Sequence, residues 1–253
     1  MQNNKKEIKL HGMSSEKASR VKLRGHNKEY LFADLIGGQA IRGTNKIDVY
    51  CRDGKRCTVK GGSEVKRKAG TEGRWQLFMF AKSRFENEKD FPGRKLFIEI
   101  LDCFPKTRSE YDKNPIIYKQ AIKTPMIKLR KYLSDKTKIH NFFNKAIFNF
   151  EIDFLVIYHN DIFHIFGREE VIDIFSRRFN IITNSTSQKV VFQYNNKIAI
   201  EIEVRKTEGK FPSILLITNK LKILGILLDN IKSLEEKKRN LHVYGKAIQN
   251  FKF

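Results

Sequence analysis

The spacing of apolar residues changes from helical to alternating along the first part of the chain. Between residues 26 and 36 they recur every three or four positions and a glycine pair follows, as in an amphipathic helix with a C-terminal cap. Residues 39–45 are short enough for an edge strand. Two β-rich runs, 46–51 and 55–60, then flank an Asp-Gly pair, and this pattern predicts a hairpin.

Further apolar runs follow the hairpin, after a glycine- and lysine-rich loop at residues 60–73. We expect an amphipathic helix over residues 74–85 and a strand over residues 95–104, where a proline ends the run. The stretch 105–149 is rich in lysine and places Ile and Leu at helical spacing. It therefore predicts helices, interrupted at two prolines within the stretch.

Beyond residue 149 the pattern becomes richer in β-structure. It predicts two hairpins within 153–166 and 188–206, a helix at 168–179, a strand at 213–218 and a helix at 219–238. We therefore expect an α/β (α+β) protein in two regions. Residues 1–149 would hold an α/β core with a basic helical extension, and residues 150–253 a β-rich half.

Composition indicates a folded chain and excludes several classes of protein. Of the 253 residues, 40% are hydrophobic, which is enough for a core. No apolar run approaches the roughly 20 residues that span a bilayer, and no apolar segment follows the N-terminal lysines as a secretory signal requires. Three cysteines without paired spacing build neither a disulfide framework nor a four-cysteine zinc site. We expect a cytoplasmic protein with no membrane partner.

Net charge is the most informative feature of the composition. The chain has 50 Lys and Arg against 28 Asp and Glu, so its formal charge is +22. This imbalance predicts a polyanionic partner, and nucleic acid is the usual polyanion inside a cell. Because the basic residues are spread along the whole chain, they favour a groove on the folded body over a basic tail. An anionic membrane surface and simple solubility are the alternatives.

Three side chains in the first region have the chemistry needed for phosphodiester hydrolysis. Glu29 is near the start of the first predicted helix, Asp48 is on the first arm of the hairpin, and Lys60 ends the second arm. Side chains on one face of paired strands converge, so Asp48 and Lys60 can meet at one end of the sheet. Carboxylates there suit a hard cation such as Mg²⁺, and an ammonium group can position the attacking water. Taken singly, they could also be a solvated Glu, a turn acceptor and one lysine among many.

The stretch 25–102 resembles the core of the PD-(D/E)xK nuclease superfamily, which includes the type II restriction endonucleases. The predicted order of helix, three strands, helix and strand (αβββαβ) is the order of that core. Asp48 stands at the motif aspartate, after Ile47 where the family often has proline, and Lys60 stands at the motif lysine. Glu29 falls where many members carry an additional helix acid. The resemblance implies a mixed-sheet, restriction-endonuclease-like core and a Mg²⁺-dependent hydrolysis that leaves a 5′-phosphate.

The sequence departs from the family motif two positions before the lysine. The motif has an acid there, and this chain has Thr58. Family members that lack this acid move it elsewhere, so Glu64 is a candidate metal ligand and Gln76 a candidate supporting group in the site. The number of bound metal ions, and catalytic activity itself, therefore stay open at this point.

Two groups of residues are candidates for contacts with DNA. Lys66 and Lys68 lie in the glycine-rich loop, where they could contact phosphates or simply be solvated. In the second region, a strand pair with Arg, Lys, Gln and Asn can enter the major groove. Its candidate residues for reading bases are Arg205, Lys206, Lys210, Gln193 and Asn195. The alternatives are a solvated face of the sheet, and cross-strand ion pairs that involve Glu201 and Glu203.

The sequence as a whole predicts a sequence-specific endonuclease that acts on double-stranded DNA, as in a restriction system. No P-loop or Gly-x-Gly-x-x-Gly motif occurs, so no nucleotide cofactor is expected. The resemblance allows a homodimer whose symmetry matches a palindromic site. A non-catalytic DNA- or RNA-binding protein with a basic groove is the competing class, and Thr58 is the main argument for it.

Overall fold

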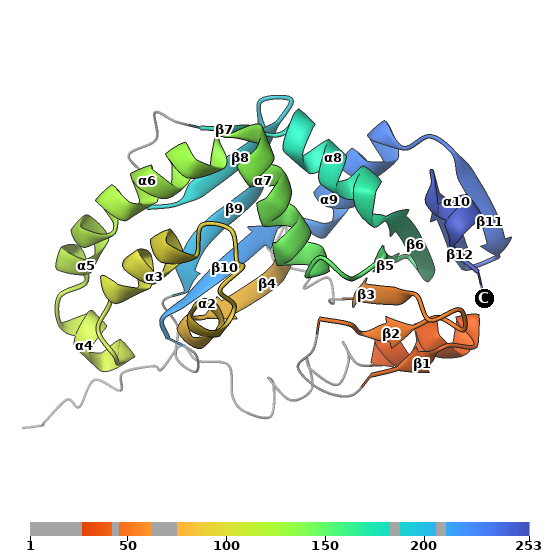
Figure 1. Ribbon diagram of the computed structural model, residues 1–253, viewed down its shortest axis with the longest axis horizontal. Helices are drawn as coiled ribbons and strands as arrows, with labels where there is room; N and C mark the ends of the chain where they lie inside the picture. The colour runs from red at the N-terminus through yellow and green to blue at the C-terminus, as the bar shows by residue number, and fades with distance from the viewer. Residues whose placement is uncertain (1–26, 42–45, 62–74, 183–187, 206–210, 253) are drawn as a thin grey trace, which may run out of the picture.

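Two β-sheets form the framework of the computed structural model, which describes residues 27–41, 46–61, 75–182, 188–205 and 211–252 (Figure 1). The first is a mixed sheet whose strands, in spatial order, are β1 (Gln39–Ala40), β2 (Val49–Tyr50), β3 (Arg56–Lys60), β5 (Phe154–His159), β6 (Ile162–Gly167), β12 (Leu241–Tyr244) and β11 (Leu234–Lys238). The second is antiparallel and consists of β4 (Trp75–Ala81), β10 (Ser213–Thr218), β9 (Lys197–Arg205), β8 (Val190–Tyr194) and β7 (Asn180–Ile181). The protein is therefore a mixed α/β structure, as the sequence predicts.

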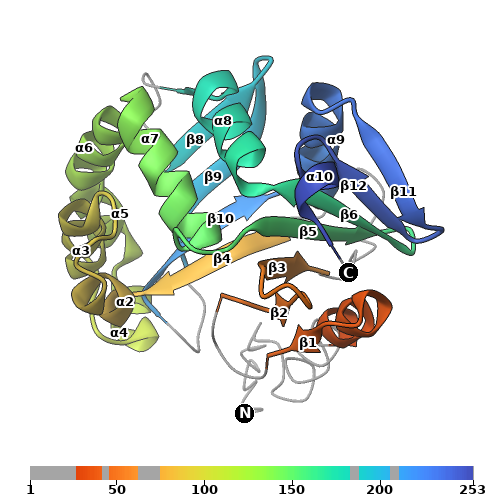
Figure 2. The same ribbon diagram turned by 45° about the vertical axis from the view of Figure 1, so that its right-hand side comes forward.

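Helices pack against both sheets. They are a helix at residues 27–36, α2 (Lys82–Asn87), α3 (Arg94–Asp102), α4 (Arg108–Lys113), α5 (Pro115–Ala121), α6 (Lys123–Leu133), α7 (Lys136–Phe143), the π-helix η1 (Asn144–Phe148), α8 (Arg168–Arg178), α9 (Lys220–Asn230) and α10 (Ala247–Asn250). Figure 2 shows α3, α6 and α7 grouped beside the antiparallel sheet and away from β1–β3. Among the described residues, none of the helices combines the length and the apolar character needed to cross a membrane.

The hairpin predicted around Asp-Gly is confirmed. β2 pairs with β3 in antiparallel register, with Val49 opposite Cys57. Gly54, in the turn, has a φ of +81°, which favours glycine because it has no Cβ. β1 adds the predicted edge strand beside β2, and β3 then pairs in parallel with β5. The helix predicted at residues 26–36 is also present, over the described residues 27–36.

Two assignments after the hairpin are wrong. Residues 74–85, predicted as one helix, form strand β4 and then α2, and residues 95–104, predicted as a strand, form α3. In β4 the side chains of Phe78 and Phe80 both lie in the core, two residues apart, as one face of a strand requires. In α3 the buried residues Phe97, Ile100 and Leu101 follow helical spacing. A short apolar run fits the spacing of a helix and that of a strand equally well. Residues 75–81 are a strand because they pair with β10.

The remaining predictions are confirmed except at Pro125, which lies inside the first turn of α6 and does not interrupt it, and at one end of α9. The lysine-rich stretch forms α4 to α7 and η1, with Pro115 in the first turn of α5, where a missing N–H costs no helical hydrogen bond. Both predicted hairpins occur, and their turn residues have positive φ: Asn160, Asp161, Asn195 and Asn196. α8 and β10 lie where predicted. The helix predicted to reach residue 238 ends at Asn230. The charged residues predicted at its C-terminal end form strand β11 instead, which pairs with β12.

The two sheets do not follow the predicted division near residue 149. β3 pairs with β5, and β4 pairs with β10, so each sheet contains strands from both sides of that boundary. The larger hydrophobic core likewise contains side chains from Leu77 to Tyr244. A second, smaller core lies between the mixed sheet and the helix at residues 27–36, where the Phe32 and Phe163 rings have centroids 5.1 Å apart. Both regions of the chain therefore contribute to the same framework.

A buried histidine–tyrosine pair links β6 to β12. His164 Nδ1 and Tyr244 Oη are 2.8 Å apart, and both side chains are buried. Burial, with a smaller effect from His242 and His159, lowers the pKa of His164 from 6.5 to about 4. Burial also raises the pKa of Tyr244 to about 12. At neutral pH the imidazole is therefore uncharged and the phenol keeps its proton, so that Tyr244 can donate to His164.

Acid is expected to destabilise the fold through His164. The unfolded imidazole has a pKa of 6.5 and the folded one about 4, so the unfolded state binds more protons between these values. The stability that neutral His164 provides is complete above pH 6.5 and is lost as the pH falls toward 4. Because solvent screens part of this effect, we expect the free energy of unfolding to fall by about 1–2 kcal/mol. Denaturant unfolding at a series of pH values measures it.

A double variant, His164→Phe with Tyr244→Phe, serves as the comparison for this pH effect. It removes the titrating group without leaving a buried hydroxyl unpaired. Its free energy of unfolding should fall less steeply than that of the native chain over the same range. Parallel curves for the two proteins would show that His164 does not contribute to acid sensitivity.

Candidate active site

Asp48 and Lys60 meet at the end of the β2–β3 hairpin. Lys60 Nζ lies 3.3 Å from Asp48 Oδ2, and both side chains are largely buried, with 16% and 13% of their surface exposed. The hairpin explains this contact: Asp48 precedes β2, its N–H donates to the Cys57 carbonyl, and Lys60 ends β3. The convergence of these two side chains, expected from the hairpin pattern, is therefore confirmed.

In the carboxylate of Asp48, a single oxygen, Oδ2, accepts all the hydrogen bonds that come from the described residues. The Thr58 hydroxyl donates to Oδ2 at 3.0 Å, and the Val59 N–H donates to the same atom at 2.6 Å. With Lys60, three donors hold Oδ2, whereas Oδ1 accepts no hydrogen bond from the part of the chain that the structure describes. The carboxylate is thus fixed in orientation and keeps one oxygen for a cation or a water molecule.

Phe78 of β4 forms an aromatic wall beside this pair. Lys60 Nζ lies 4.9 Å from the centroid of the Phe78 ring, and Lys46 Nζ lies 5.1 Å from it. Both distances allow a cation–π interaction, which favours an ammonium group over an aromatic face. The two sheets therefore meet at the candidate site, because Lys60 ends a strand of one sheet and Phe78 belongs to the other.

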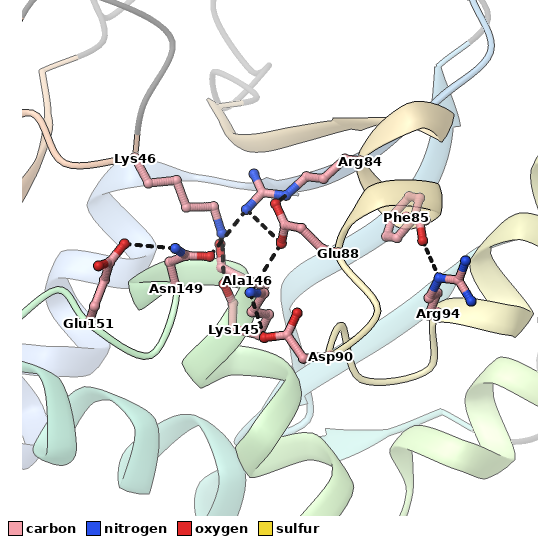
Figure 3. Close-up of polar contacts among 10 residues, drawn as sticks. All are labelled: Lys46, Arg84, Phe85, Glu88, Asp90, Arg94, Lys145, Ala146, Asn149 and Glu151. Atoms are coloured by element: carbon pink, nitrogen blue, oxygen red, sulfur yellow. Dashed lines mark hydrogen bonds and ion pairs between the residues drawn. The ribbon is translucent and has the colours of Figure 1, made fainter.

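Lys46 anchors the segment that carries Asp48. Its Nζ donates to the carbonyl oxygens of Lys145 and Ala146, both at 2.7 Å, at the π-helix η1. Figure 3 shows the amine of Lys46 among these carbonyls, with Arg84 and Glu88 close by. Burial is the main reason that the pKa of Lys46 lies well below its ordinary value, and the positive charges of Arg84, Lys145 and Lys60 lower it further. Glu88 opposes this shift.

Ion pairs join η1 to the loop after α2. Lys145, which is almost fully buried, contacts Asp90 at 2.8 Å and Glu88 at 3.2 Å, and Arg84 contacts Glu88 at 2.8 Å. The hydrogen bond from Lys145 lowers the pKa of Asp90, although burial opposes the shift. Because these acids already have cationic partners, the charges of Lys145, Arg84, Glu88 and Asp90 balance within the network (Figure 3).

The other residues proposed for catalysis lie in different places. The helix that carries Glu29 packs on the face of the mixed sheet formed by Val49, Cys57 and Val59, whereas Thr58 and Lys60 project from the opposite face. Gln76, expected on a helix, lies on strand β4, where it pairs with Ile217. Glu64 and the loop lysines Lys66 and Lys68 lie outside the described residues.

The described residues proposed for reading bases lie at opposite ends of the β8–β9 hairpin. Asn195 is in the exposed β8–β9 turn and Gln193 is next to it, opposite Ile198. Arg205 is at the far end of β9, seven residues beyond Ile198, which is about 23 Å along a strand. There its Nη1 contacts Met79 Sδ at 3.2 Å. Lys206 and Lys210 lie outside the described residues.

The ion-pair alternative for this strand is confirmed. Lys189 Nζ lies 3.0 Å from carboxylate oxygens of both Glu201 and Glu203. The acids on β9 therefore have a cationic partner in the residue that precedes β8. Arg205, Glu201 and Glu203 project from the face opposite Ile200, Ile202 and Val204, which pack in the core.

Sequence reasoning missed Lys46 and Phe78. Lys46 is two residues before Asp48, so in an extended segment both side chains project to the same side, and this spacing was a usable signal. Phe78 carried no such signal, because its place depends on which sheet β4 joins.

Among the described residues there is no group of three or more His, Cys, Asp or Glu side chains arranged to hold a metal ion. No family model, curated protein or solved structure matches the chain.

Proposed function

We propose that the chain is a Mg²⁺-dependent endonuclease that hydrolyses phosphodiester bonds in double-stranded DNA, of the restriction-enzyme type. The observation that carries this proposal is the contact of Asp48 with Lys60 at a strand end, with Asp48 Oδ1 accepting no hydrogen bond from the described residues. A single carboxylate oxygen does not complete the shell of a hard cation. Phosphate oxygens, water and Glu64 are the further ligands in this proposal, because the helix that carries Glu29 packs on the opposite face of the sheet.

Asp48 and Lys60 have separate roles in the proposed reaction. Asp48 holds the cation through Oδ1, because Oδ2 is held by three donors of its own hairpin. Lys60 orients the attacking water or stabilises the charge on the pentavalent phosphate. Mg²⁺, when bound, supplies Lewis-acid stabilisation of that charge. The net charge of +22 holds the DNA polyanion near the pair.

The order of elements also supports the family resemblance, in a modified form. A helix at residues 27–36, the three strands β1–β3 and then β5, parallel to β3, occur in that order along the chain. In this proposal β5 takes the place of the last core strand, which the sequence placed at residues 95–104. Strand β4 and the helices α2–α7 are then an insertion between β3 and β5.

Incubation of the purified chain with plasmid DNA tests the proposal. With Mg²⁺ we expect discrete fragments that do not form when EDTA is present, because the cation is needed to stabilise charge on the phosphate. Sequencing of the fragment ends should show a recurring site and 5′-phosphates. The absence of cleavage with both Mg²⁺ and Mn²⁺ would reject the nuclease proposal.

A non-catalytic DNA-binding protein is the second candidate, and one observation favours it. Thr58 stands where the resemblance expects an acid, and its hydroxyl donates to Asp48. In that case the Asp48–Lys60 pair is a structural ion pair of the hairpin. Salt-sensitive binding of duplex DNA without any cleavage would support this candidate.

A further inference from the structure

The helices α5 and α6 form a nearly continuous run that contains no acidic residue. The backbone at Ile122, between them, stays in the right-handed helical region. Its N–H donates to the Tyr118 carbonyl and its carbonyl accepts from Met126, so helical hydrogen bonding continues through the junction. From Pro115 to Leu133 the sequence holds five basic residues and no Asp or Glu, namely Lys119, Lys123, Lys128, Arg130 and Lys131.

Three of these lysines project from one side of the run. On a regular helix Lys119, Lys123 and Lys131 fall within an arc of about 120°, and all three are exposed. Lys128, beside them, pairs with Glu99 at 2.6 Å. Within the part of the chain that the structure describes, the other three make no ion pair. We call Lys119, Lys123 and Lys131 the lysine stripe.

Helix α5 is also poorly covered by the rest of the protein. None of its residues is buried, and Ile116 and Ile117 are 62% and 57% exposed. An isolated helix of this length is not stable in water without packing on a partner. The exposed isoleucines and the uncompensated lysines therefore mark one surface that a partner would cover.

We propose that the lysine stripe binds the phosphate backbone of duplex DNA, at a distance from the Asp48–Lys60 pair. The assignment rests on charge: a second copy of this chain would bring the same positive face, whereas a duplex brings a regular row of negative charges. Twelve residues separate Lys119 from Lys131, so the stripe extends about 18 Å, or roughly five base pairs along a duplex. The inference depends on the proposed function only for the identity of the polyanion.

The position of the stripe indicates contact with DNA that flanks the cleavage centre. In Figures 1 and 2, α5 and α6 lie at one end of the molecule and β2 and β3 lie toward the other. Phosphate contacts position a protein on the duplex without reading its sequence. The stripe therefore adds affinity on one side of the cut, and it does so without sequence preference.

The test is the salt dependence of binding to a duplex long enough to reach both α6 and β3. The triple variant Lys119→Gln, Lys123→Gln, Lys131→Gln should reduce the slope of log K against log salt by about 2–3, since each phosphate contact contributes about 0.9. Replacing the same three lysines with arginine should keep the slope. Lys232→Gln, Lys246→Gln, Lys252→Gln changes the net charge equally at exposed lysines elsewhere and should leave the slope nearly unchanged.

The outcomes separate this inference from the proposed nuclease activity. Equal slopes for the two glutamine variants would overturn the stripe as a specific contact, whether or not the protein cuts DNA. A reduced slope only for the stripe variant would support it, even if no cleavage occurs. Anionic vesicles are the second ligand: if the stripe variant loses vesicle binding and keeps duplex binding, the surface serves a membrane and the inference is wrong.

Discussion

Replacing Asp48 with asparagine is expected to reduce Mg²⁺-dependent DNA cleavage by about 10²- to 10⁴-fold, while duplex binding is retained. The amide oxygen can still accept hydrogen bonds from Val59 N–H and the Thr58 hydroxyl, so the hairpin keeps its geometry. The variant loses the negative charge that would hold the cation and pair with Lys60. Cleavage rates and fluorescence anisotropy on the same duplex measure the two effects.

The control for this experiment lies in the same hairpin. Asp53→Asn removes one negative charge at the turn, where Asp53 pairs with Lys55 on the surface. It changes the net charge by the same amount and should leave the cleavage rate close to that of the native chain. If Asp48→Asn cuts as fast as this control, Asp48 does not take part in the chemistry.

The second large effect concerns Thr58, the position at which the chain departs from the motif of the nuclease superfamily that it resembles. Thr58 is completely buried, and its hydroxyl lies 3.0 Å from Asp48 Oδ2. Thr58→Asp would put a second carboxylate against the first, and we expect a loss of about 3 kcal/mol in the free energy of unfolding when EDTA is present. A divalent cation between the two carboxylates should restore about 2.7 kcal/mol at a hundred times its Kd.

Thermal unfolding with EDTA and with excess Mg²⁺ or Mn²⁺ measures this effect. Thr58→Asn is the matched variant, since it has similar volume and no charge, and its melting temperature should not respond to the metal. A metal response of Thr58→Asp alone would show that the end of this hairpin has the geometry of a metal site. The same melting temperature for Thr58→Asp in both conditions would show that Asp48 does not face a cation-binding position.

The hairpin and its two polar residues could be predicted because they depend on local chain geometry. An Asp-Gly turn fixes the pairing of its arms over a few residues, and that pairing places Asp48 near Lys60. The β8–β9 hairpin, with Asn195 and Asn196 in its turn, was predictable for the same reason. In these segments the turn sets the register, and the register sets which side chains meet.

Segments that lack a turn signal were harder to assign. Residues 75–81 and 94–102 are short apolar runs that suit either a strand or a helix, and the local pattern predicts the wrong type for each. β4 is a strand because β10 pairs with it, and β10 is more than 130 residues away in the sequence. Contacts between residues so far apart in the sequence do not change the local spacing of apolar residues.

The candidate site shows the same division between local and long-range contacts. The sequence alone determined the positive charge, the hairpin and the meeting of Asp48 with Lys60, because these depend on composition and on neighbouring residues. Only the tertiary structure placed Phe78 beside Lys60 and joined Lys46 to η1. It also left the lysine stripe on the exposed side of α5 and α6. These features depend on how the two sheets and their helices pack, and packing joins residues that the sequence keeps far apart.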